Sequence, residues 1–595
     1  MSGSIAHPHL PQRANPASRR LLFICILAFV IALGAALLAE VLVALIGLIT
    51  NLAFYGRVSL AFTSPAENHL GLWVILIPVI GGLVVGVMAR WGSPAIRGHG
   101  IPEVMERVLL GESRIPPRLT ILKPVGTAIS IGTGGPFGAE GPIIATGGAL
   151  GSLVGQGLRM TADERKTLLA AGAAAGMAAV FGAPVSATIL AVELLLFEYR
   201  ASSLAPVALA CAAAAAVRVA LHGTAAIFPM EITATPSGPA LAAYTIIGII
   251  VGGFGVAITR GLYFIEDLFE RLPIHWMWWP ALGGVVVGIM GYLSPRTLGV
   301  GYDNIQQLLD GTLAGQVLLL LVLCKLVSWS VALGSGTAGG TLAPLFTIGG
   351  GAGVLLGALV AALLPSLGID PRVAGLVGMA AAFTGASRAL LASVVFAFEA
   401  TRQPMGLLPL LAGCTGAYLI SLRTMRYTIM TERLARRGTP VITEYAADFL
   451  ARSLVRDHAS AAVVTLSATQ SVQETLAWLQ QPGAPGHQGF PLLGLDGTLA
   501  GVITRRDLMN AAADGQVLND LVRRPPLVVS GHHSLREAAD IMVRGKVGRL
   551  PVVAEDGSGR VVGILTRSDL LEAHERRLDE TGRIADATLW GERAT

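Results

Sequence analysis

Three short turns in the apolar part of the sequence combine glycine with proline. They are Gly98–Pro102 (GHGIP), Gly138–Pro142 (GAEGP) and Gly340–Pro344 (GTLAP). Glycine lets the backbone approach an ion, and proline in a first helical turn has no amide hydrogen to leave unpaired. A helix N-terminus offers free amides and the positive end of the helix dipole. The turns therefore predict weak anion-binding positions, which an ion can also leave.

The second turn carries a carboxylate, Glu140, within an apolar stretch. Apolar surroundings favour the neutral acid, whereas nearby helix N-termini favour the ion. An ionised side chain is able to occupy an anion position and block it, and a protonated one is able to swing away. We expect Glu140 to act as a gate and proton carrier. For the residue alone, the alternative is that it only caps a helix.

An internal repeat relates the second turn to the third at a constant offset of 202 residues. After a further shift of four residues, Glu193 falls on Glu399. Transporters are commonly built from two related halves whose ion sites lie near mid-membrane, so we expect the turns to converge there. The main matches are Gly132 with Gly334, Gly134 with Gly336, Pro142 with Pro344, and residues 176–179 with 378–381.

The composition predicts an integral membrane protein. Of the 595 residues, 53% are hydrophobic and only 14% are charged, which is too apolar for an ordinary soluble protein. Apolar runs such as 21–48, 70–88 and 317–333 are long enough to cross a bilayer as helices. Shorter runs are interrupted by glycine or proline, which a membrane body tolerates only inside protein or along a watery cavity. We expect a polytopic α-helical domain with broken helices.

The N-terminal residues 1–20 are polar and contain Arg13, Arg19 and Arg20, which favours an uncleaved cytoplasmic N-terminus. The polar tail shares that side if the number of crossings is even. The net charge of +5 reflects this topology and not nucleic-acid binding. Cys25, Cys211, Cys324 and Cys414 lie in apolar runs without metal-ligand spacing, so we expect buried thiols and no metal site.

From about residue 440 the composition changes to that of an α/β fold with its own repeat. Each copy predicts strand, turn, strand and helix, and Asp496-Gly497 and Asp556-Gly557 supply the turns. The copies are 490–493 with 501–508 and 550–553 with 563–570.

The three turns, in this order and followed by Tyr427 before the charged stretch 433–437, resemble the CLC family of chloride channels and transporters. The resemblance covers residues 21–437 and implies a homodimer with one pore per subunit. Each pore would be built from two inverted halves, 21–235 and 240–437. Glu140 corresponds to the gating glutamate. The anion-binding residues that the resemblance implies are Gly98, His99, Gly100, Ile101, Pro102, Gly138, Ala139, Gly141, Thr341, Leu342 and Tyr427.

Three departures from the family pattern leave the halide preference open. His99 stands where exchangers have serine, or proline in nitrate-preferring members. Its ring is able to donate to the anion and make transport pH-sensitive, or else only its backbone matters. Ala139 replaces a common basic residue, and Leu342 replaces the phenylalanine of the third turn.

A fourth departure concerns the proton path. Proton-coupled members end a helix with two adjacent glutamates, the second being the inner proton-transfer residue, but here the pair is Glu193-Leu194. Because leucine does not relay a proton, we predict passive chloride conduction gated by Glu140. Glu198, one helical turn beyond, is an alternative proton donor.

The tail, residues 438–595, resembles a pair of CBS domains at 440–515 and 520–578. In that family the threonine and aspartate of each repeat face an adenine nucleotide. The resemblance therefore implies a nucleotide site at Thr504, Asp507, Thr566 and Asp569, with no cofactor required. Alternatively, these side chains only cap helices.

The sequence thus predicts a multi-pass bacterial inner-membrane protein that conducts chloride, senses pH and is modulated by its CBS tail. The first alternative is a chloride/proton antiporter of the same family. The remote alternative is a CBS-regulated cation transporter, although the body lacks the clustered carboxylates of a divalent-cation path. An enzyme is not expected, because no catalytic triad or phosphate loop is recognisable in the sequence.

Overall fold

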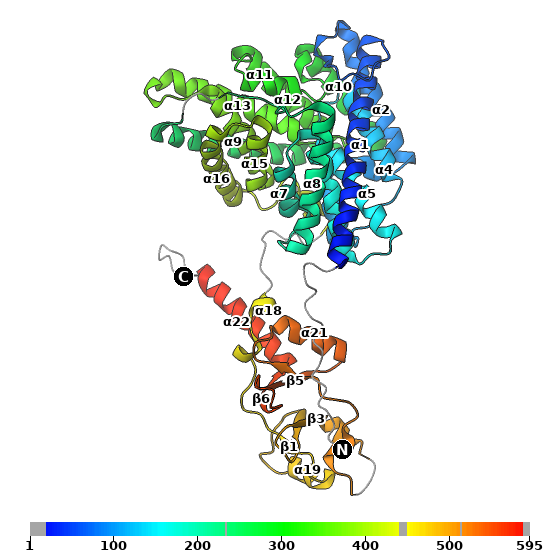
Figure 1. The fold of residues 1–595 in the computed structure, drawn as a ribbon. Coiled ribbons are helices and arrows are strands. Elements are labelled where there is room, and N and C mark those ends of the chain that lie inside the picture. The colour runs from blue at the N-terminus through cyan, green and yellow to red at the C-terminus, as the bar shows by residue number, and fades with distance from the viewer. Residues whose placement is uncertain (1–18, 232–234, 439–448, 512–514, 587–595) are drawn as a thin grey trace. The chain divides into compact units, whose positions relative to one another are not determined.

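A computed structural model describes residues 19–231, 235–438, 449–511 and 515–586. The described residues form two compact units, one up to residue 438 and one from residue 449 (Figure 1). The predicted N-terminal segment 1–20 lies almost wholly outside the described residues, as does the predicted domain boundary near 438–440.

The first unit is entirely helical in its described part, as predicted for a membrane domain. Eight of its described helices are long and apolar enough to cross a membrane. The helices are α1 (Arg19–Tyr55), α2 (Leu76–Trp91), α3 (Ile101–Leu110), α4 (Leu119–Gly132), α5 (Glu140–Gly157), α6 (Ala162–Phe181), α7 (Pro184–Ala191), α8 (Ala201–His222), α9 (Gly238–Glu270), α10 (Trp279–Leu293), α11 (Tyr302–Leu309), α12 (Gly315–Gly334), α13 (Leu342–Leu363), α14 (Pro371–Ser387), α15 (Leu390–Thr401), α16 (Leu407–Thr424) and α17 (Glu432–Arg436).

The internal repeat extends over two sets of eight helices, α1–α8 and α9–α16. Helices α5 and α13 begin 202 residues apart, and α8 and α16 begin 206 residues apart. The shift of four residues arises in α14, which continues to Ser387 beyond Phe383, whereas α6 ends at the equivalent Phe181. One additional helical turn therefore explains the shift.

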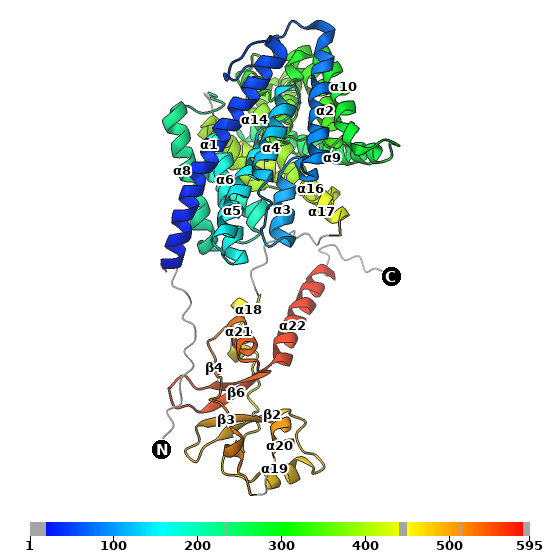
Figure 2. The same cartoon turned by 90° about the vertical axis from the view of Figure 1, so that its right-hand side faces the viewer.

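Close glycine contacts pack α5 against α6 and α13 against α14. A Cβ on Gly147 would collide with the Gly172 carbonyl, and a Cβ on Gly349 would collide with the Gly378 carbonyl. Helix α6 is buried on nearly all sides, which its alanine- and glycine-rich sequence permits. The long helix α1, blue in both views, lies against α6 and α8 (Figures 1 and 2).

Several helices of the membrane unit are short or interrupted, as predicted. Helices α3 and α11 are too short to span a bilayer. Helix α7 continues into a π-helical turn at Val192–Leu196, which ends at Phe197 with φ of +52°. These interruptions are buried in protein, where their backbone groups find partners.

The second unit contains two three-stranded sheets of identical topology, ordered β1-β2-β3 and β4-β5-β6. In each sheet the first pair is parallel and the second antiparallel, which confirms the predicted strand, turn, strand and helix order. The elements are α18 (Phe449–Arg452), β1 (Leu466–Ser467), α19 (Val472–Leu479), β2 (Gly489–Leu493), β3 (Leu499–Thr504), α20 (Arg505–Met509), β4 (Val529–Ser530), α21 (Leu535–Gly545), β5 (Arg549–Val553), β6 (Val561–Thr566) and α22 (Arg567–Asp586).

Candidate functional site

The second and third glycine turns bind each other through equivalent residues of the two halves. The Gly340 amide donates to the Gly138 carbonyl at 2.8 Å, and the Gly138 amide donates to the Gly340 carbonyl at 3.4 Å. These two glycines are related by the 202-residue offset. Their reciprocal contact shows that the halves meet around a local two-fold axis at this point.

The first turn packs onto the same place. A Cβ on Gly141 would collide with the His99 carbonyl, and a Cβ on Gly100 would collide with the Gly141 carbonyl. Gly100 also has φ of +92°, which favours glycine. Gly98 bridges to Ala338, just ahead of the third turn. All three predicted turns therefore converge.

Helices α3, α5 and α13 all begin within these turns and lack side-chain caps. Their N-cap residues, Gly100, Ala139 and Thr341, make no side-chain cap hydrogen bond. Thr161 caps α6 and Asp370 caps α14, whereas most other helices of this unit, such as α8 and α12, also begin without a side-chain cap. Amides of an uncapped first turn are available to an anion, and the helix dipole favours its charge.

Three buried polar side-chain atoms at the turns have no hydrogen-bond partner among the described residues. They are His99 Nδ1, Glu140 Oε2 and Thr341 Oγ1. Buried polar atoms are rarely left without a partner, so these three atoms mark the turns as the candidate binding position. Each is a donor, or becomes one in the suitable tautomer or protonation state.

The Glu140 side chain is completely buried and lies between the N-termini of α5 and α13. A Cβ on either Gly138 or Gly340 would collide with its carboxylate. Its Oε1 accepts a hydrogen bond of 3.0 Å from the Tyr302 hydroxyl. The carboxylate therefore lies at the N-termini of two helices, whose dipoles favour its ionised form.

Tyr302, the first residue of α11, is a site residue that the sequence reasoning missed. It lies 202 residues after Gly100, so the repeat places it opposite the first glycine turn. Extending the repeat alignment to that turn would have found it. The hydroxyl of Tyr302 contacts the Glu140 carboxylate. The family resemblance implied a different hydroxyl, that of Tyr427, and placed it against the anion.

Two buried lysines at equivalent positions, Lys123 and Lys325, hold the backbone that leads into α3 and α11. Lys325 Nζ donates to the carbonyls of Thr297 at 3.0 Å and Gly299 at 2.9 Å. Lys123 Nζ lies within hydrogen-bond distance of the four consecutive carbonyls of residues 95–98. Lys123 therefore fixes the turn of His99, whose carbonyl packs against Gly141 in α5. Lys325 fixes the loop before Tyr302, which contacts Glu140 at the start of α5.

Most of the predicted anion-binding residues come together in these turns. Ile101 and Pro102 form the buried first turn of α3, Ala139 precedes the gate, and Leu342 is the buried first residue of α13. The position of the anion itself, and the role of each of these residues, stay predictions.

The predicted residue Tyr427 follows α16 and is half-buried. The guanidinium of Arg426 lies 5.3 Å from the centroid of its ring. In the described part of the chain, its hydroxyl makes no hydrogen bond to the three turns. The role proposed for Tyr427 therefore stays a prediction.

Glu193 and Glu399, which the repeat aligned, cap each other's helices. Glu193 accepts from the amides of Leu391 at 3.0 Å and Ala392 at 3.2 Å at the start of α15. Glu399 accepts from the amides of Val185 and Ser186, at 3.1 and 2.7 Å, at the start of α7. Both carboxylates have structural partners across the local two-fold axis.

Leu194, which replaces the inner proton-transfer residue, is buried with 5% of its surface exposed. Glu198, the alternative proton donor, lies 3.1 Å from Lys166 Nζ and accepts a 2.8 Å hydrogen bond from the Ser203 hydroxyl. Neither residue is hydrogen-bonded to Glu140 in the described structure.

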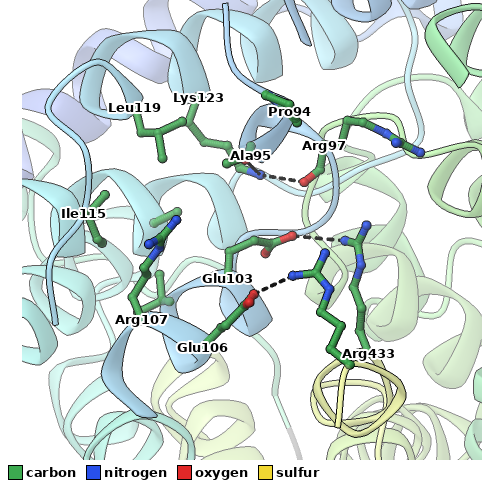
Figure 3. Close-up of a pocket in the computed structure, with 13 residues that line it drawn as sticks. Pro94, Ala95, Arg97, Glu103, Glu106, Arg107, Ile115, Leu119, Lys123 and Arg433 are labelled. Carbon is green, nitrogen blue, oxygen red and sulfur yellow. Dashed lines mark hydrogen bonds and ion pairs between the residues drawn. The ribbon is translucent and has the colours of Figure 1, made fainter. Parts of the chain in front are cut away.

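A cavity of about 200 Å³ lies beside the first turn (Figure 3). A Cβ on Gly98 would meet both the Glu103 carboxylate and the Arg433 guanidinium, so this ion pair, which lines the cavity, lies directly against the first turn. The cavity is lined by Pro94, Ala95, Arg97, Glu103, Val104, Glu106, Arg107, Ile115, Leu119, Lys123, Ala145, Arg433 and Arg437.

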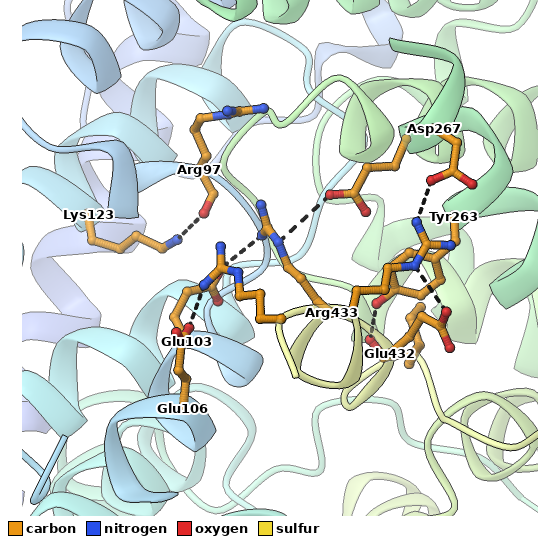
Figure 4. A network of polar contacts seen from close by, with 12 residues as sticks. Arg97, Glu103, Glu106, Lys123, Tyr263, Asp267, Glu432 and Arg433 are labelled. Carbon is orange, nitrogen blue, oxygen red and sulfur yellow. Dashed lines mark hydrogen bonds and ion pairs between the residues drawn. The ribbon is translucent and has the colours of Figure 1, made fainter. Parts of the chain in front are cut away.

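Ion pairs at this cavity tie α17 to α3 and α9 (Figure 4). Arg433 pairs with Glu103 at 3.2 Å, Arg437 pairs with Glu106 at 2.7 Å, and Arg436 pairs with Asp267. Of the five cations that line the cavity, Arg433 and Arg437 are thereby paired with its two carboxylates. The lining therefore keeps an excess of positive charge.

In the second unit, the predicted nucleotide-binding residues cap helices. Thr504 donates to Asp507 Oδ2 at 2.6 Å at the start of α20, and Thr566 donates to Asp569 Oδ2 at 3.0 Å at the start of α22. This is the alternative function foreseen from the sequence. Nucleotide binding stays a prediction.

Among the described residues, no group of three or more His, Cys, Asp or Glu side chains could hold a metal ion. The four cysteines are free thiols, and Cys211, Cys324 and Cys414 are buried as predicted, whereas Cys25 is half-buried.

The fold defines a multi-pass helical membrane protein whose three glycine turns converge between two repeats. The family model described as "Voltage gated chloride channel" matches residues 81–422, and the CBS domain model matches 455–514 and 518–576. Because the first match covers more than half of the chain, the chain belongs to the voltage-gated chloride channel family. It also carries a C-terminal pair of CBS domains.

Curated relatives match the membrane unit. A putative chloride channel protein ClcB-like from Ralstonia nicotianae is 27% identical over 61% of this chain and 85% of its own length. An H(+)/Cl(-) exchange transporter ClcA from Vibrio campbellii is 30% identical over 60% of this chain and 78% of its own length.

Solved structures share the fold. A slow cyanobacterial Cl-/H+ antiporter superposes with a TM-score of 0.62 at 26% identity, over 70% of this chain and 97% of its own. A eukaryotic CLC transporter covers 92% of this chain and 97% of its own, with a TM-score of 0.55 at 20% identity. The second match supports the fold alone.

Proposed function

We propose that this chain exchanges chloride for protons across a membrane, and that Glu140 is the group shared by the two ions. The observation that carries the proposal is the position of its carboxylate, buried between the N-termini of α5 and α13 with one oxygen unpaired. A carboxylate and a chloride ion are both anions that helix N-termini stabilise, so they compete for this position.

The protonation state of Glu140 decides whether its carboxylate or a chloride ion occupies this position. The ionised Glu140 holds the position through the helix amides and the Tyr302 hydroxyl. A proton removes its charge and most of that stabilisation, so the neutral side chain leaves and chloride takes its place. When the side chain releases the proton on the other side and returns, it displaces the chloride. One cycle moves the two ions in opposite directions.

The inner approach for chloride runs from the cavity beside α3 to the first turn. The Glu103–Arg433 ion pair stands between the cavity and Gly98, so its opening would admit the anion to His99. No lysine or arginine of the cavity needs to bind the ion permanently, and weak contacts allow it to leave.

The relatives support exchange rather than the passive conduction predicted from the sequence. Curated relatives carry the name H(+)/Cl(-) exchange transporter, and the cyanobacterial structure is that of a Cl-/H+ antiporter. They also favour chloride over the cation of the remote alternative.

Passive chloride conduction remains the second candidate, because Leu194 offers no proton-transfer group. Glu193 accepts hydrogen bonds from two amides of α15. Glu198 pairs with Lys166 and accepts a hydrogen bond from Ser203. Exchange therefore requires protons to reach Glu140 from the inner side through water or another residue.

Chloride-driven proton movement in liposomes tests the proposal. Vesicles containing the protein receive a chloride gradient without a proton gradient, and an external pH electrode records protons while a chloride electrode records chloride. Exchange predicts uphill proton movement that stops in Glu140→Ala while chloride flux continues. Chloride flux without proton movement in the unaltered protein would favour passive conduction.

The remaining features are proposed from the family resemblance. The protein would be a homodimer in a bacterial inner membrane, with its N-terminus and CBS pair in the cytoplasm. An adenine nucleotide would bind at Thr504, Asp507, Thr566 and Asp569 and alter transport. If AMP and ATP change neither the thermal unfolding of the full chain nor its chloride flux, the nucleotide site is refuted.

A further inference from the structure

The hydroxyl of Tyr302 is the one side-chain donor found on the Glu140 carboxylate in the described structure. The distance from this hydroxyl to Glu140 Oε1 is 3.0 Å. A hydrogen bond to an ionised acceptor is about twice as strong as one between neutral groups, so the contact favours the ionised side chain in its present position.

The ring of Tyr302 is held by aromatic neighbours, so its hydroxyl has little freedom. Its centroid lies 5.9 Å from that of Phe181 on α6, 6.0 Å from Phe228 and 6.3 Å from Phe62. The contacts with Phe181 and Phe228 are edge-on, which is a favourable geometry for aromatic pairs. Three separate segments therefore fix the direction of the hydroxyl.

The backbone that carries Tyr302 is fixed as well. Gly301, its N-cap, has φ of +79°, and the Thr297 and Gly299 carbonyls of the preceding loop accept hydrogen bonds from the buried Lys325 ammonium. A Cβ on Gly301 would lie 3.4 Å from Lys325 Nζ. The lysine thus holds the loop that presents Tyr302 to the gate.

We propose that Tyr302 is a positioning residue that latches the ionised Glu140 side chain in the anion path, with Lys325 holding the latch in place. The proposal rests on the proposed role of Glu140 as a movable gate. In this proposal, α11 of the second half supplies the hydroxyl that holds the Glu140 side chain, whereas α3 of the first half supplies the backbone that faces the anion.

The latch has a pH-dependent consequence, because only the ionised side chain is held strongly. The charged and titratable groups near this pair are Lys325 on α12, which acts on Glu140, and Arg218 on α8, which acts on Tyr302. His99 lies in the adjoining turn. A Tyr302→Phe substitution changes none of these groups and removes only the hydroxyl.

Chloride flux in liposomes, measured from pH 4 to pH 8, tests the latch in Tyr302→Phe. The variant is expected to conduct chloride about tenfold faster at neutral pH, as the loss of one hydrogen bond to a charged group implies. Its half-maximal flux should move to higher pH, because the unlatched gate takes up a proton more readily. Tyr244→Phe, which loses a buried hydroxyl bonded to Asp370, is the matched control and should leave both quantities unchanged.

The same substitution in a Glu140→Ala background separates a latch from a structural effect. With no carboxylate to hold, Tyr302→Phe should change neither rate nor pH profile. An equal effect in both backgrounds, or no effect in either, would overturn the proposal. Proton movement is recorded in the same vesicles. If the unaltered protein moves no protons but Tyr302→Phe still changes chloride flux only in the presence of Glu140, exchange is refuted while the role of Tyr302 is supported.

Discussion

Removal of the Glu140 side chain should strengthen chloride binding by about thirtyfold. In the unaltered protein an incoming chloride must displace the carboxylate, which loses its hydrogen bond from Tyr302 and its attraction to the N-termini of α5 and α13. The hydrogen bond to a charged group is worth about 1.5 kcal/mol at the lower end of its range. Each helix N-terminus adds about 0.3 kcal/mol at its lower end. Together these interactions amount to about 2 kcal/mol, or about thirtyfold in affinity.

Isothermal titration of chloride into detergent-solubilised protein in chloride-free buffer measures this change directly for Glu140→Ala. Glu164→Ala removes a carboxylate at the start of α6, away from the turns, and serves as the control with unchanged affinity. Equal or weaker chloride binding by Glu140→Ala would show that the carboxylate and chloride do not share a position.

Three further predictions concern the framework of the site. Gly141→Ala should abolish chloride flux, because its Cβ would collide with a neighbouring carbonyl. Glu193→Gln and Glu399→Gln should lower the thermal unfolding midpoint in detergent by similar amounts, because each carboxylate accepts two amide hydrogen bonds at an equivalent helix start. The hydrogen bond from Arg20 lowers the pKa of Glu164 to about 2, so this pair should stabilise the protein above about pH 4.5 and lose its effect as the pH falls toward 2. Unfolding of Arg20→Gln and the unaltered protein, compared at pH 6 and pH 3, measures that loss.

Each of these predictions has a control in the same chain. Gly157→Ala adds a Cβ in open space and should keep its flux, so a similar loss would refute the collision argument for Gly141. Unequal effects of Glu193→Gln and Glu399→Gln would contradict their equivalence. A stability difference for Arg20→Gln that is the same at both pH values would contradict the assigned ion pair.

The sequence was sufficient to predict the convergence of the three turns and the two-half organisation, whereas the gating role of Glu140 stays a prediction. The turns can be recognised from neighbouring residues alone, because glycine and proline together in an apolar stretch are typical of a tight turn at a helix start. The 202-residue offset then implied that the second and third turns converge, and the structure joins Gly138 and Gly340 by two hydrogen bonds.

Other features depend on contacts between segments far apart in the chain. Tyr302 reaches Glu140 across 162 residues, and nothing in its immediate sequence indicates that contact. The repeat aligned Glu193 with Glu399, but it does not show that each carboxylate caps the helix of the other half. That contact depends on the packing of α7 against α15. The direction of the Tyr427 side chain depends on its packing after α16, which its sequence position does not fix.

The choice between exchange and conduction shows a further limit of reasoning from one position. Leu194 favoured a channel, because it replaces a known proton-transfer residue. The relatives favour exchange, and the buried Glu140 carboxylate is the group that we propose both ions share. A proton path is a chain of water and side chains, so the loss of one group does not exclude another route.

The zero-flux potential of the protein in liposomes tests chloride–proton exchange most directly. Vesicles with equal chloride on both sides and a tenfold proton gradient are held at defined membrane potentials with potassium and valinomycin, and net flux is recorded at each potential. Exchange through Glu140 predicts that flux vanishes at a potential displaced from zero in the direction set by the proton gradient. Flux that vanishes at zero, the equilibrium potential of chloride, would contradict the coupling and leave a passive chloride pathway.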